Sequence, residues 1–188
     1  MRSLIHRDPQ LTMSSAKSNL ARIRLRPLRR KDSALLYKWI TDRDLAILNS
    51  AFHPVSETDH ESWIAAMMKR RTDSVFFVIE NRRTKKAIGT CQLHKISAVH
   101  RTAELQIRIG EKAHQGQGFG SEAVRLLVEF GFRDLNLHRI SLHVFASNQR
   151  AVRAYQKCGF TEEGRLREAV FIDGKHIDVL IMGLLRND

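Results

Sequence analysis

Gln115-Gly116-Gln117-Gly118-Phe119-Gly120-Ser121-Glu122-Ala123 is the stretch on which the prediction of the fold rests. Its glycines occupy alternate positions and are followed directly by a helical pattern. Glycine tolerates positive φ and lets a ligand approach the backbone, so successive N–H groups can turn toward one anion where the helix begins. We therefore predict that this loop holds a pyrophosphate group.

The segments on either side define the unit that carries the loop. From Thr102 to Ile109, apolar and polar residues alternate, which is the pattern of a half-buried strand. From Ala123 to Phe132, apolar residues recur at helical spacing and form a wide apolar stripe. The predicted unit is a strand, a loop, a glycine turn and a helix.

Other phosphate-binding loops fit this unit less well. A dinucleotide fingerprint has the spacing G-x-G-x-x-G straight after the strand, whereas here the spacing is G-x-G-x-G and the six residues from Gly110 to Gln115 intervene. A P-loop closes with Gly-Lys-Ser/Thr, which does not occur in this sequence. A glycine-rich loop that binds nothing is the remaining alternative, because isolated glycine motifs are weak signals.

Two motifs resemble the GNAT family of N-acetyltransferases. Residues 115–120 are similar to the family signature Arg/Gln-x-x-Gly-x-Gly/Ala, which cradles the pyrophosphate of acetyl-CoA. Residues 148–160 are similar to the family segment Asn-x-x-Ala-x-x-x-Tyr-x-x-x-Gly-Phe, and the two motifs occur in family order at a typical separation. The ending, Glu163-Gly164-x-x-Arg167 followed by Asp173-Gly174 and Asp178, resembles the Rim-type branch, which acetylates the N-termini of ribosomal proteins.

The resemblance extends from about residue 23 to residue 185 and implies the GNAT fold. This fold is α+β, with a mixed, mostly antiparallel central sheet of six to seven strands and about four flanking helices. Independently, two hairpin patterns and the lack of strict βαβ repetition favour an α+β class. Strands are expected at 23–26, 75–80, 87–94, 102–109, 139–144, 160–170 and 176–184, and helices at about 31–42, 60–69, 123–132 and 150–157.

Two details of this pattern concern the first half of the chain. Ser56 and Asp59 form an N-cap pattern ahead of the helix that starts near His60. The stretch from Asp42 to Pro54 is expected to be a loop. In the family that the chain resembles, the first two helices and this loop form the wall of the acceptor pocket.

The resemblance also implies the residues that would bind acetyl-CoA. The backbone of residues 107–109 would polarise the acetyl carbonyl. Asn148 would place its amide against the pantetheine arm, but it also precedes a helix, where Asn is a favoured N-cap. The predicted cofactor-binding residues are Ile107, Arg108, Ile109, Gln115, Gly116, Gln117, Gly118, Phe119, Gly120, Ser121 and Asn148.

Acetyl transfer to an amine needs a general acid and a route for the amine proton. Tyr155 matches the family's general acid, and a phenol of pKa about 10 can protonate a departing thiolate of pKa about 8.5. The alternative is a tyrosine that only packs beside Ala151 and Cys158. Glu104, on the polar side of the strand next to the loop, is the candidate base, directly or through water, although it could equally be a solvated carboxylate.

No metal site is predicted. The nine histidines include no His-x-x-x-His pair, and no Cys-x-x-Cys or Gly-x-Ser-x-Gly motif occurs. Cys91 and Cys158 are interpreted as free buried thiols, and without a secretory signal we expect a cytoplasmic protein.

The 188 residues are interpreted as a flexible leader, residues 1–21, and a single domain, residues 22–188. No apolar run approaches 18 residues, so no membrane span is expected. The net charge of +12 favours anionic partners such as CoA, a nucleotide-linked sugar or RNA, and argues mildly against a polyamine. Ribosome association and a homodimer remain open as predictions.

These observations favour an acetyl-CoA-dependent N-acetyltransferase whose acceptor amine attacks directly. The acceptor stays open between a protein N-terminus and a small amine such as an aminosugar, an aminoglycoside or a polyamine. Acids available for a cationic acceptor are Asp42, Asp44, Glu57, Asp59, Asp173 and Asp178. The alternative outside this class is a non-catalytic acyl-CoA-binding or RNA-associated protein on the same fold.

Overall fold

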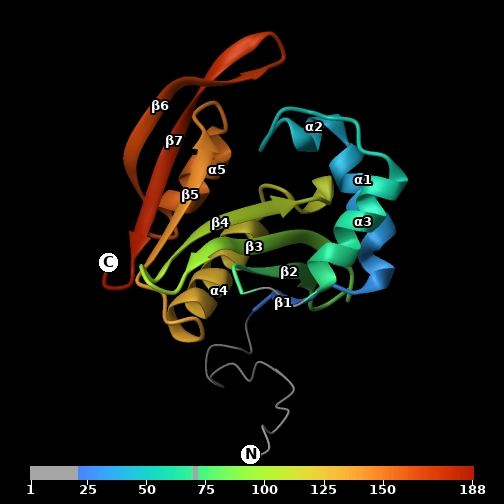
Figure 1. Ribbon diagram of the computed structural model, residues 1–188, viewed down its shortest axis with the longest axis horizontal. Helices are drawn as coiled ribbons and strands as arrows, with labels where there is room; N and C mark the ends of the chain where they lie inside the picture. The colour runs from blue at the N-terminus through green and yellow to red at the C-terminus, as the bar shows by residue number, and fades with distance from the viewer. Residues whose placement is uncertain (1–20, 70–71) are drawn as a thin grey trace, which may run out of the picture.

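A seven-stranded sheet forms the centre of the computed structural model, which describes residues 21–69 and 72–188. The predicted leader, residues 1–21, falls outside the described residues apart from Ala21. The strands are β1 (Ile23–Pro27), β2 (Ser74–Asn81), β3 (Ala87–Ser97), β4 (Thr102–Ile109), β5 (Arg139–Phe145), β6 (Thr161–Ile172) and β7 (Lys175–Leu185). Their order is β1-β2-β3-β4-β5-β7-β6, and every neighbouring pair is antiparallel except β4 and β5. This arrangement confirms the α+β prediction (Figure 1).

The α-helices of the described residues number five, one more than expected. They are α1 (Ser33–Thr41), α2 (Arg43–Ala46), α3 (Glu57–Met68), α4 (Phe119–Arg133) and α5 (Gln149–Gln156), with three-residue turns of 3-10 helix at Arg30–Asp32 and Lys112–His114. The additional helix is α2, which lies in the stretch that the sequence predicted as a loop. It forms because the Asp42 side chain accepts a hydrogen bond from the Leu45 N–H and caps a single turn. None of the described helices has the length and apolar character needed to cross a membrane.

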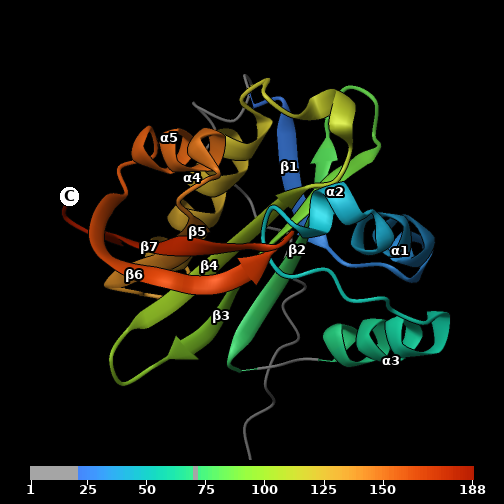
Figure 2. The same ribbon diagram turned by 90° about the horizontal axis from the view of Figure 1, so that it is seen from above.

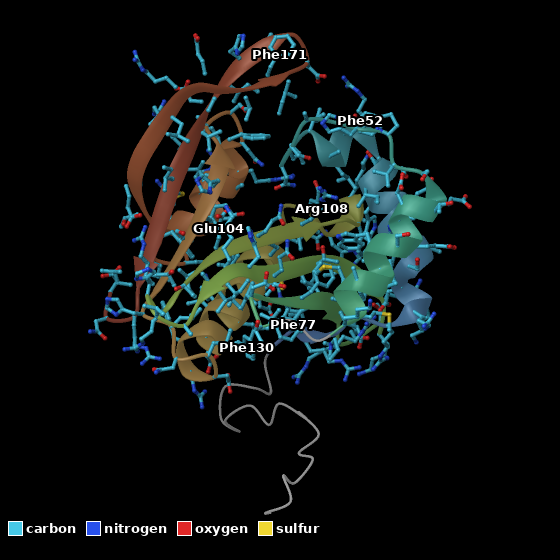
Figure 3. All side chains as sticks on the ribbon, viewed as in Figure 1. Phe52, Phe77, Glu104, Arg108, Phe130 and Phe171 are labelled. Carbon is cyan, nitrogen blue, oxygen red and sulfur yellow. The ribbon has the colours of Figure 1, made fainter. Side chains whose placement is uncertain are left out.

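Two successive phenylalanines on β2 show how the sheet separates its two faces. The Phe77 ring packs edge-on against Phe130 of α4, with 5.2 Å between ring centroids (Figure 3). The Phe76 ring packs edge-on against Trp63 of α3, at 5.7 Å. Because side chains alternate across a strand, α4 covers one face and α3 the other. Figure 2 shows α4 and α5 together on one side of the sheet and α3 on the opposite side.

Among the strands of the described residues, β4 and β5 are the only neighbours that run parallel. Pairing covers three positions, from Thr102 opposite Arg139 to Glu104 opposite Ser141. Beyond this point the strands diverge, and β5 continues with β7 and β6 away from β1–β4 (Figure 1). The edge of β4 from Leu105 to Ile109 therefore has no strand partner on the β5 side. This open edge determines where a ligand can enter the sheet.

A buried ion cluster fastens β1 to β2 and to the start of α1. The Arg26 guanidinium, 6% exposed, donates to Asp32 Oδ1 and Oδ2 at 2.7 Å and to Glu80 Oε2 at 2.6 Å. Burial alone would raise the pKa of Asp32, but the bonds from Arg26 and from the Arg29 N–H lower it below its ordinary value. Both carboxylates are thus kept ionised, Asp32 by Arg26 and Glu80 by Arg26 together with the more exposed Arg24.

Replacing Arg26 with Gln is expected to lower the free energy of unfolding by about 3 to 5 kcal/mol, because two carboxylates then lose their buried counter-charge. Urea denaturation measures this. The matched control is Arg24→Gln, which also removes a partner of Glu80 but at a side chain that is 46% exposed, and which should cost less than about 1 kcal/mol. Equal losses in the two variants would contradict a special role for the buried cluster.

Candidate functional site

The glycine loop ends in a helix N-terminus that is open to a ligand. Gly116 and Gly118 have φ values of 74° and 83°, and Gly118 is the N-cap of α4. The first N–H group that closes a turn of this helix is that of Glu122, which donates to the Gly118 carbonyl at 3.1 Å. The preceding N–H groups have no partner within the helix, and the helix dipole places partial positive charge at the same point. The backbone therefore has the conformation that the predicted anion cradle requires, and anion binding there stays a prediction.

Arg22 holds this loop in place from the start of β1. The Glu122 carboxylate accepts from the Arg22 N–H at 2.7 Å and from Arg22 Nε at 3.0 Å, while Arg22 Nη1 donates to the Gln117 carbonyl at 3.0 Å. The guanidinium also lies over the Phe119 ring, 4.4 Å from its centroid. These contacts fix the loop before any ligand arrives, which lowers the entropy cost of binding.

A cavity of about 290 Å³, called cavity 1 below, lies between the open edge of β4, the glycine loop and α5. Nine of the eleven predicted cofactor-binding residues line it: Ile107, Arg108, Ile109, Gln115, Gly116, Gly118, Gly120, Ser121 and Asn148. Of the other two, Gln117 donates from its side chain to the Ala113 carbonyl, and Phe119 is buried beneath Arg22. The structure therefore brings most of the predicted set together, while their roles in binding remain predictions.

Two amides connect the walls of cavity 1. Gln115 Nε2 donates to the Ile109 carbonyl at 2.9 Å, and Gln115 Oε1 accepts from Arg150 Nη2 at 2.9 Å, so this side chain joins β4 to α5. Asn148 Oδ1 accepts from the Ala151 N–H at 3.2 Å, which confirms the predicted N-cap. Its Nδ2 atom donates to the Leu48 carbonyl at 3.4 Å.

Three cations on α5 and just after it were not predicted as part of the site. Arg150, Arg153 and Lys157 all line cavity 1. Their spacing of three and four residues places them on one side of the helix, and this spacing was readable from the sequence. Together with the helix N-terminus of α4 they make cavity 1 suitable for a ligand with several phosphate groups.

Tyr155 lies in the wall of cavity 1, within the main hydrophobic core. Burial raises its pKa well above the ordinary value for tyrosine, so the phenol stays protonated throughout the neutral range. The ring packs against Phe160 at 6.0 Å. The position thus combines the packing that the sequence offered as the alternative with access to the cavity that an acid needs.

Glu104 lies away from both cavities described here. Its Oε2 accepts from Lys95 Nζ at 2.7 Å, and its Oε1 lies 3.0 Å from His143 Nδ1 (Figure 3). Burial alone would raise the pKa of Glu104, but the hydrogen bonds from Lys95 and His143 lower it. A carboxylate whose ionised form is stabilised is a weaker base. The prediction that Glu104 acts as a base therefore gains no support from this geometry.

A second cavity of about 510 Å³, called cavity 2 below, lies on the opposite face of the sheet, among α1, α3 and residues 49–55. Its floor is the polar side of β3 and β4, with Thr90, Gln92, Gln106 and Arg108. Asn49, Ile107 and Arg108 line both cavities, so the two meet at the end of β4. Helix α2 stands at this junction, with Leu45 in cavity 1 and Ala46 in cavity 2.

The comparisons with known proteins agree with this architecture. The family model described as "Acetyltransferase (GNAT) domain" matches residues 22–161. The fold and the family match together define an acetyltransferase. The chain belongs to the GNAT family of N-acetyltransferases.

Named relatives refine this placement. A spermidine N(1)-acetyltransferase of Vibrio cholerae is 43% identical over 111 residues, which are 59% of this chain and 63% of that protein. A spermidine N(1)-acetyltransferase of Escherichia coli is 32% identical over 172 residues, 88% of this chain and 87% of that protein. The crystal structure of the spermidine N-acetyltransferase from Vibrio cholerae in complex with CoA and spermine superposes with a TM-score of 0.81 at 34% identity, over 88% of this chain and 96% of that one. These relatives favour a different branch from the Rim-type branch that the C-terminal motif suggested.

Replacing Gly118 with Ala is expected to weaken CoA binding about tenfold or more, since positive φ costs about 1 to 2 kcal/mol for a residue with a Cβ. The added Cβ would also lie 3.3 Å from Arg22 Nη2. Isothermal titration calorimetry with CoA measures the change.

The matched control is Gly174→Ala, at a φ of 75° in the β6–β7 turn, where a Cβ meets nothing within 4 Å. Both variants should lose similar stability in urea, but only Gly118→Ala should lose CoA affinity. Unchanged affinity in Gly118→Ala would remove the loop from the binding site.

Proposed function

We propose that this protein transfers the acetyl group of acetyl-CoA to a primary amine of a polyamine such as spermidine. The observation that carries the proposal is the meeting of two cavities at the end of β4. Cavity 1 has the features of a site for a donor that carries several phosphate groups. Cavity 2 opens on the opposite face of the sheet between α1 and α3. A donor and an acceptor bound in the two cavities would meet beside residues 107 and 108.

The lining of cavity 1 supports acetyl-CoA as the donor. The helix N-terminus of α4 and the cations of α5 suit the pyrophosphate, and the open edge of β4 offers backbone groups to the amides of the pantetheine arm. The backbone at Ile107 to Ile109 would then lie against the thioester, where its N–H groups could stabilise the negative charge that develops on the carbonyl oxygen.

The reaction itself needs few groups. The amine nitrogen attacks the carbonyl carbon, the new C–N bond forms, and the C–S bond breaks. The thiolate takes a proton from the Tyr155 phenol, which recovers one from water, and the nitrogen loses its proton to water. Burial raises the pKa of Tyr155, which keeps the phenol protonated before each turnover and also makes it a weaker acid toward the thiolate.

The polyamine assignment rests on the relatives whose names specify spermidine and spermine. It replaces the expectation that the positive net charge disfavours such a substrate, because net charge describes the whole surface and not the cavity. Of the acids considered for a cationic acceptor, Asp59 lines cavity 2. Asp42 and Asp44 instead pair with Lys112, Asp173 with Arg43, and Asp178 with Arg165.

Thiol release from acetyl-CoA, followed with Ellman's reagent, tests the acceptor class. We expect release with spermidine or spermine to exceed release with a peptide that has a free N-terminus, an aminoglycoside and a nucleotide-linked aminosugar by at least about tenfold in kcat/KM. Faster release with the peptide would favour the N-terminal acceptor predicted from the sequence. Lack of release with every amine would contradict the enzymatic proposal.

Replacing Tyr155 with Phe is expected to lower kcat by about a hundredfold or more while leaving CoA affinity within about twofold, because only the proton donor is removed. The matched control is Tyr37→Phe, at the other tyrosine of the chain, whose hydroxyl donates to the Val55 carbonyl. That variant should retain most of kcat. A Tyr155→Phe protein with unchanged kcat would show that the tyrosine only packs.

A further inference from the structure

Arg108 occupies an unusual position for a cation. It lines both cavities, so the residue lies at the junction where donor and acceptor would meet, and alternation along β4 places its side chain on the face that forms the floor of cavity 2 (Figure 3). Within the part of the chain that the structure describes, it has no carboxylate partner and no side-chain hydrogen bond. Burial lowers its pKa, and no opposing charge contributes to that change. An arginine in such a setting keeps its charge and acts on whatever enters the cavity.

Among the described residues that line the two cavities, Asp59 has the only carboxylate. Glu104, on the same side of β4, is four residues away, or about 13 Å along the strand. Its carboxylate is engaged by Lys95 and His143. Asp59, which lines cavity 2, accepts a hydrogen bond from Ser56 Oγ at 2.6 Å at the N-terminus of α3. The acceptor amine must therefore become neutral by another route.

The other titratable groups that line the two cavities around Arg108 are histidines, one thiol, one phenol, Asp59 and several cations. In cavity 2 they are His53, Asp59, His60 and Cys91. His60 Nε2 lies 2.9 Å from the Ser33 carbonyl, and burial raises the pKa of the Cys91 thiol. In cavity 1 they are His114, Tyr155 and three cations, Arg150, Arg153 and Lys157. The charged groups nearest the reaction are thus mostly positive, which reinforces the effect of Arg108.

We propose that Arg108 lowers the pKa of the attacking amine and so supplies a neutral nucleophile without a carboxylate base. An ammonium group beside a fixed, poorly solvated cation is destabilised relative to the neutral amine, and it releases its proton to water. The free amine then attacks as described above. The inference rests on the proposed acetyl transfer and adds to it the origin of the nucleophile. Binding of a polyamine is weakened at this end, and its remaining ammonium groups stay outside the junction.

The test is the pH dependence of the single-turnover rate of acetyl transfer at saturating spermidine, which reports the protonation of the bound complex. Arg108→Gln should move the low-pH limb upward by about 1 pH unit, because the bound amine regains its ordinary pKa. Near neutral pH the rate should fall about tenfold, and above pH 10 it should recover to within about twofold. Arg108→Lys, which keeps the charge, should leave the limb close to that of the wild type.

Arg133→Gln is the control for net charge, since Arg133 is an exposed residue of α4 that pairs with Glu129. The pH–rate profile of Arg133→Gln should match that of the wild type. Far-UV circular dichroism and urea denaturation verify that each variant is folded. If Arg108→Gln does not fold, the wild type provides the test. For several acceptor amines of different pKa, the low-pH limb of its pH–rate profile should lie at least about 1 pH unit below the pKa of the free amine.

The inference is overturned, and the proposed function is left intact, if the wild type is active and the low-pH limb of the pH–rate profile does not move in Arg108→Gln. The same holds if Arg108→Gln loses activity equally at every pH and the wild type prefers amines that carry a carboxylate or phosphate, since Arg108 would then bind an anion of the acceptor. If the wild type releases no thiol with any amine, the proposed function fails and the inference fails with it.

Discussion

The separation of β4 from β5 after three paired residues is the constraint on which the rest of this structure depends. A sheet that continued pairing would leave no backbone edge for a ligand and no space between its halves. Because the pairing stops at Glu104, the edge of β4 from Leu105 to Ile109 has no strand partner on the β5 side among the described residues, and α5 and the glycine loop face it across cavity 1. Contacts outside cavity 1 hold the diverging strands in this arrangement. Arg43 of α2 pairs with Asp173 in the β6–β7 turn, and Ile47 packs against the cluster that contains Phe145 and Val179.

The distribution of charge around the site differs from what the net charge of the chain suggests. Fixed positive charge is concentrated at cavity 1, where a helix N-terminus and the cations of α5 converge. The carboxylates of the chain are mostly engaged elsewhere: Asp32 and Glu80 with Arg26, Glu122 with Arg22, and Glu163 with Arg139. The consequence is a donor site suited to phosphates and a reaction junction whose charge disfavours an ammonium ion.

The sequence predicted the parts of the fold that depend on local pattern. The bounds of β4 agreed with the alternation from Thr102 to Ile109, and Ser56 and Asn148 cap helices as expected. The glycine loop adopted the backbone conformation that its spacing indicated. Each of these features is decided by residues within a few positions of one another, so a single sequence contains the information.

The remaining features depend on contacts between distant segments. Alternation assigned Glu104 and Arg108 to the same side of β4, but it could not show that Arg108 alone reaches the cavities. Helix α2 was missed because one turn has too little periodicity to detect, and because one of its contacts, the ion pair of Arg43 with Asp173, joins residues that are 130 positions apart. The Rim-type resemblance came from a C-terminal motif outside the acceptor cavity, which explains why it misjudged the branch.

The central claim is that cavities 1 and 2 are the two halves of one reaction site, joined at Ile107 and Arg108. The most direct measurement is calorimetric binding of a bisubstrate analogue in which spermidine is linked through an acetyl group to the sulfur of CoA. If the cavities are joined, one molecule occupies both, and it should bind at least about a hundredfold more tightly than CoA alone. An affinity equal to that of CoA would mean that the polyamine part gains no contact, and it would contradict the account.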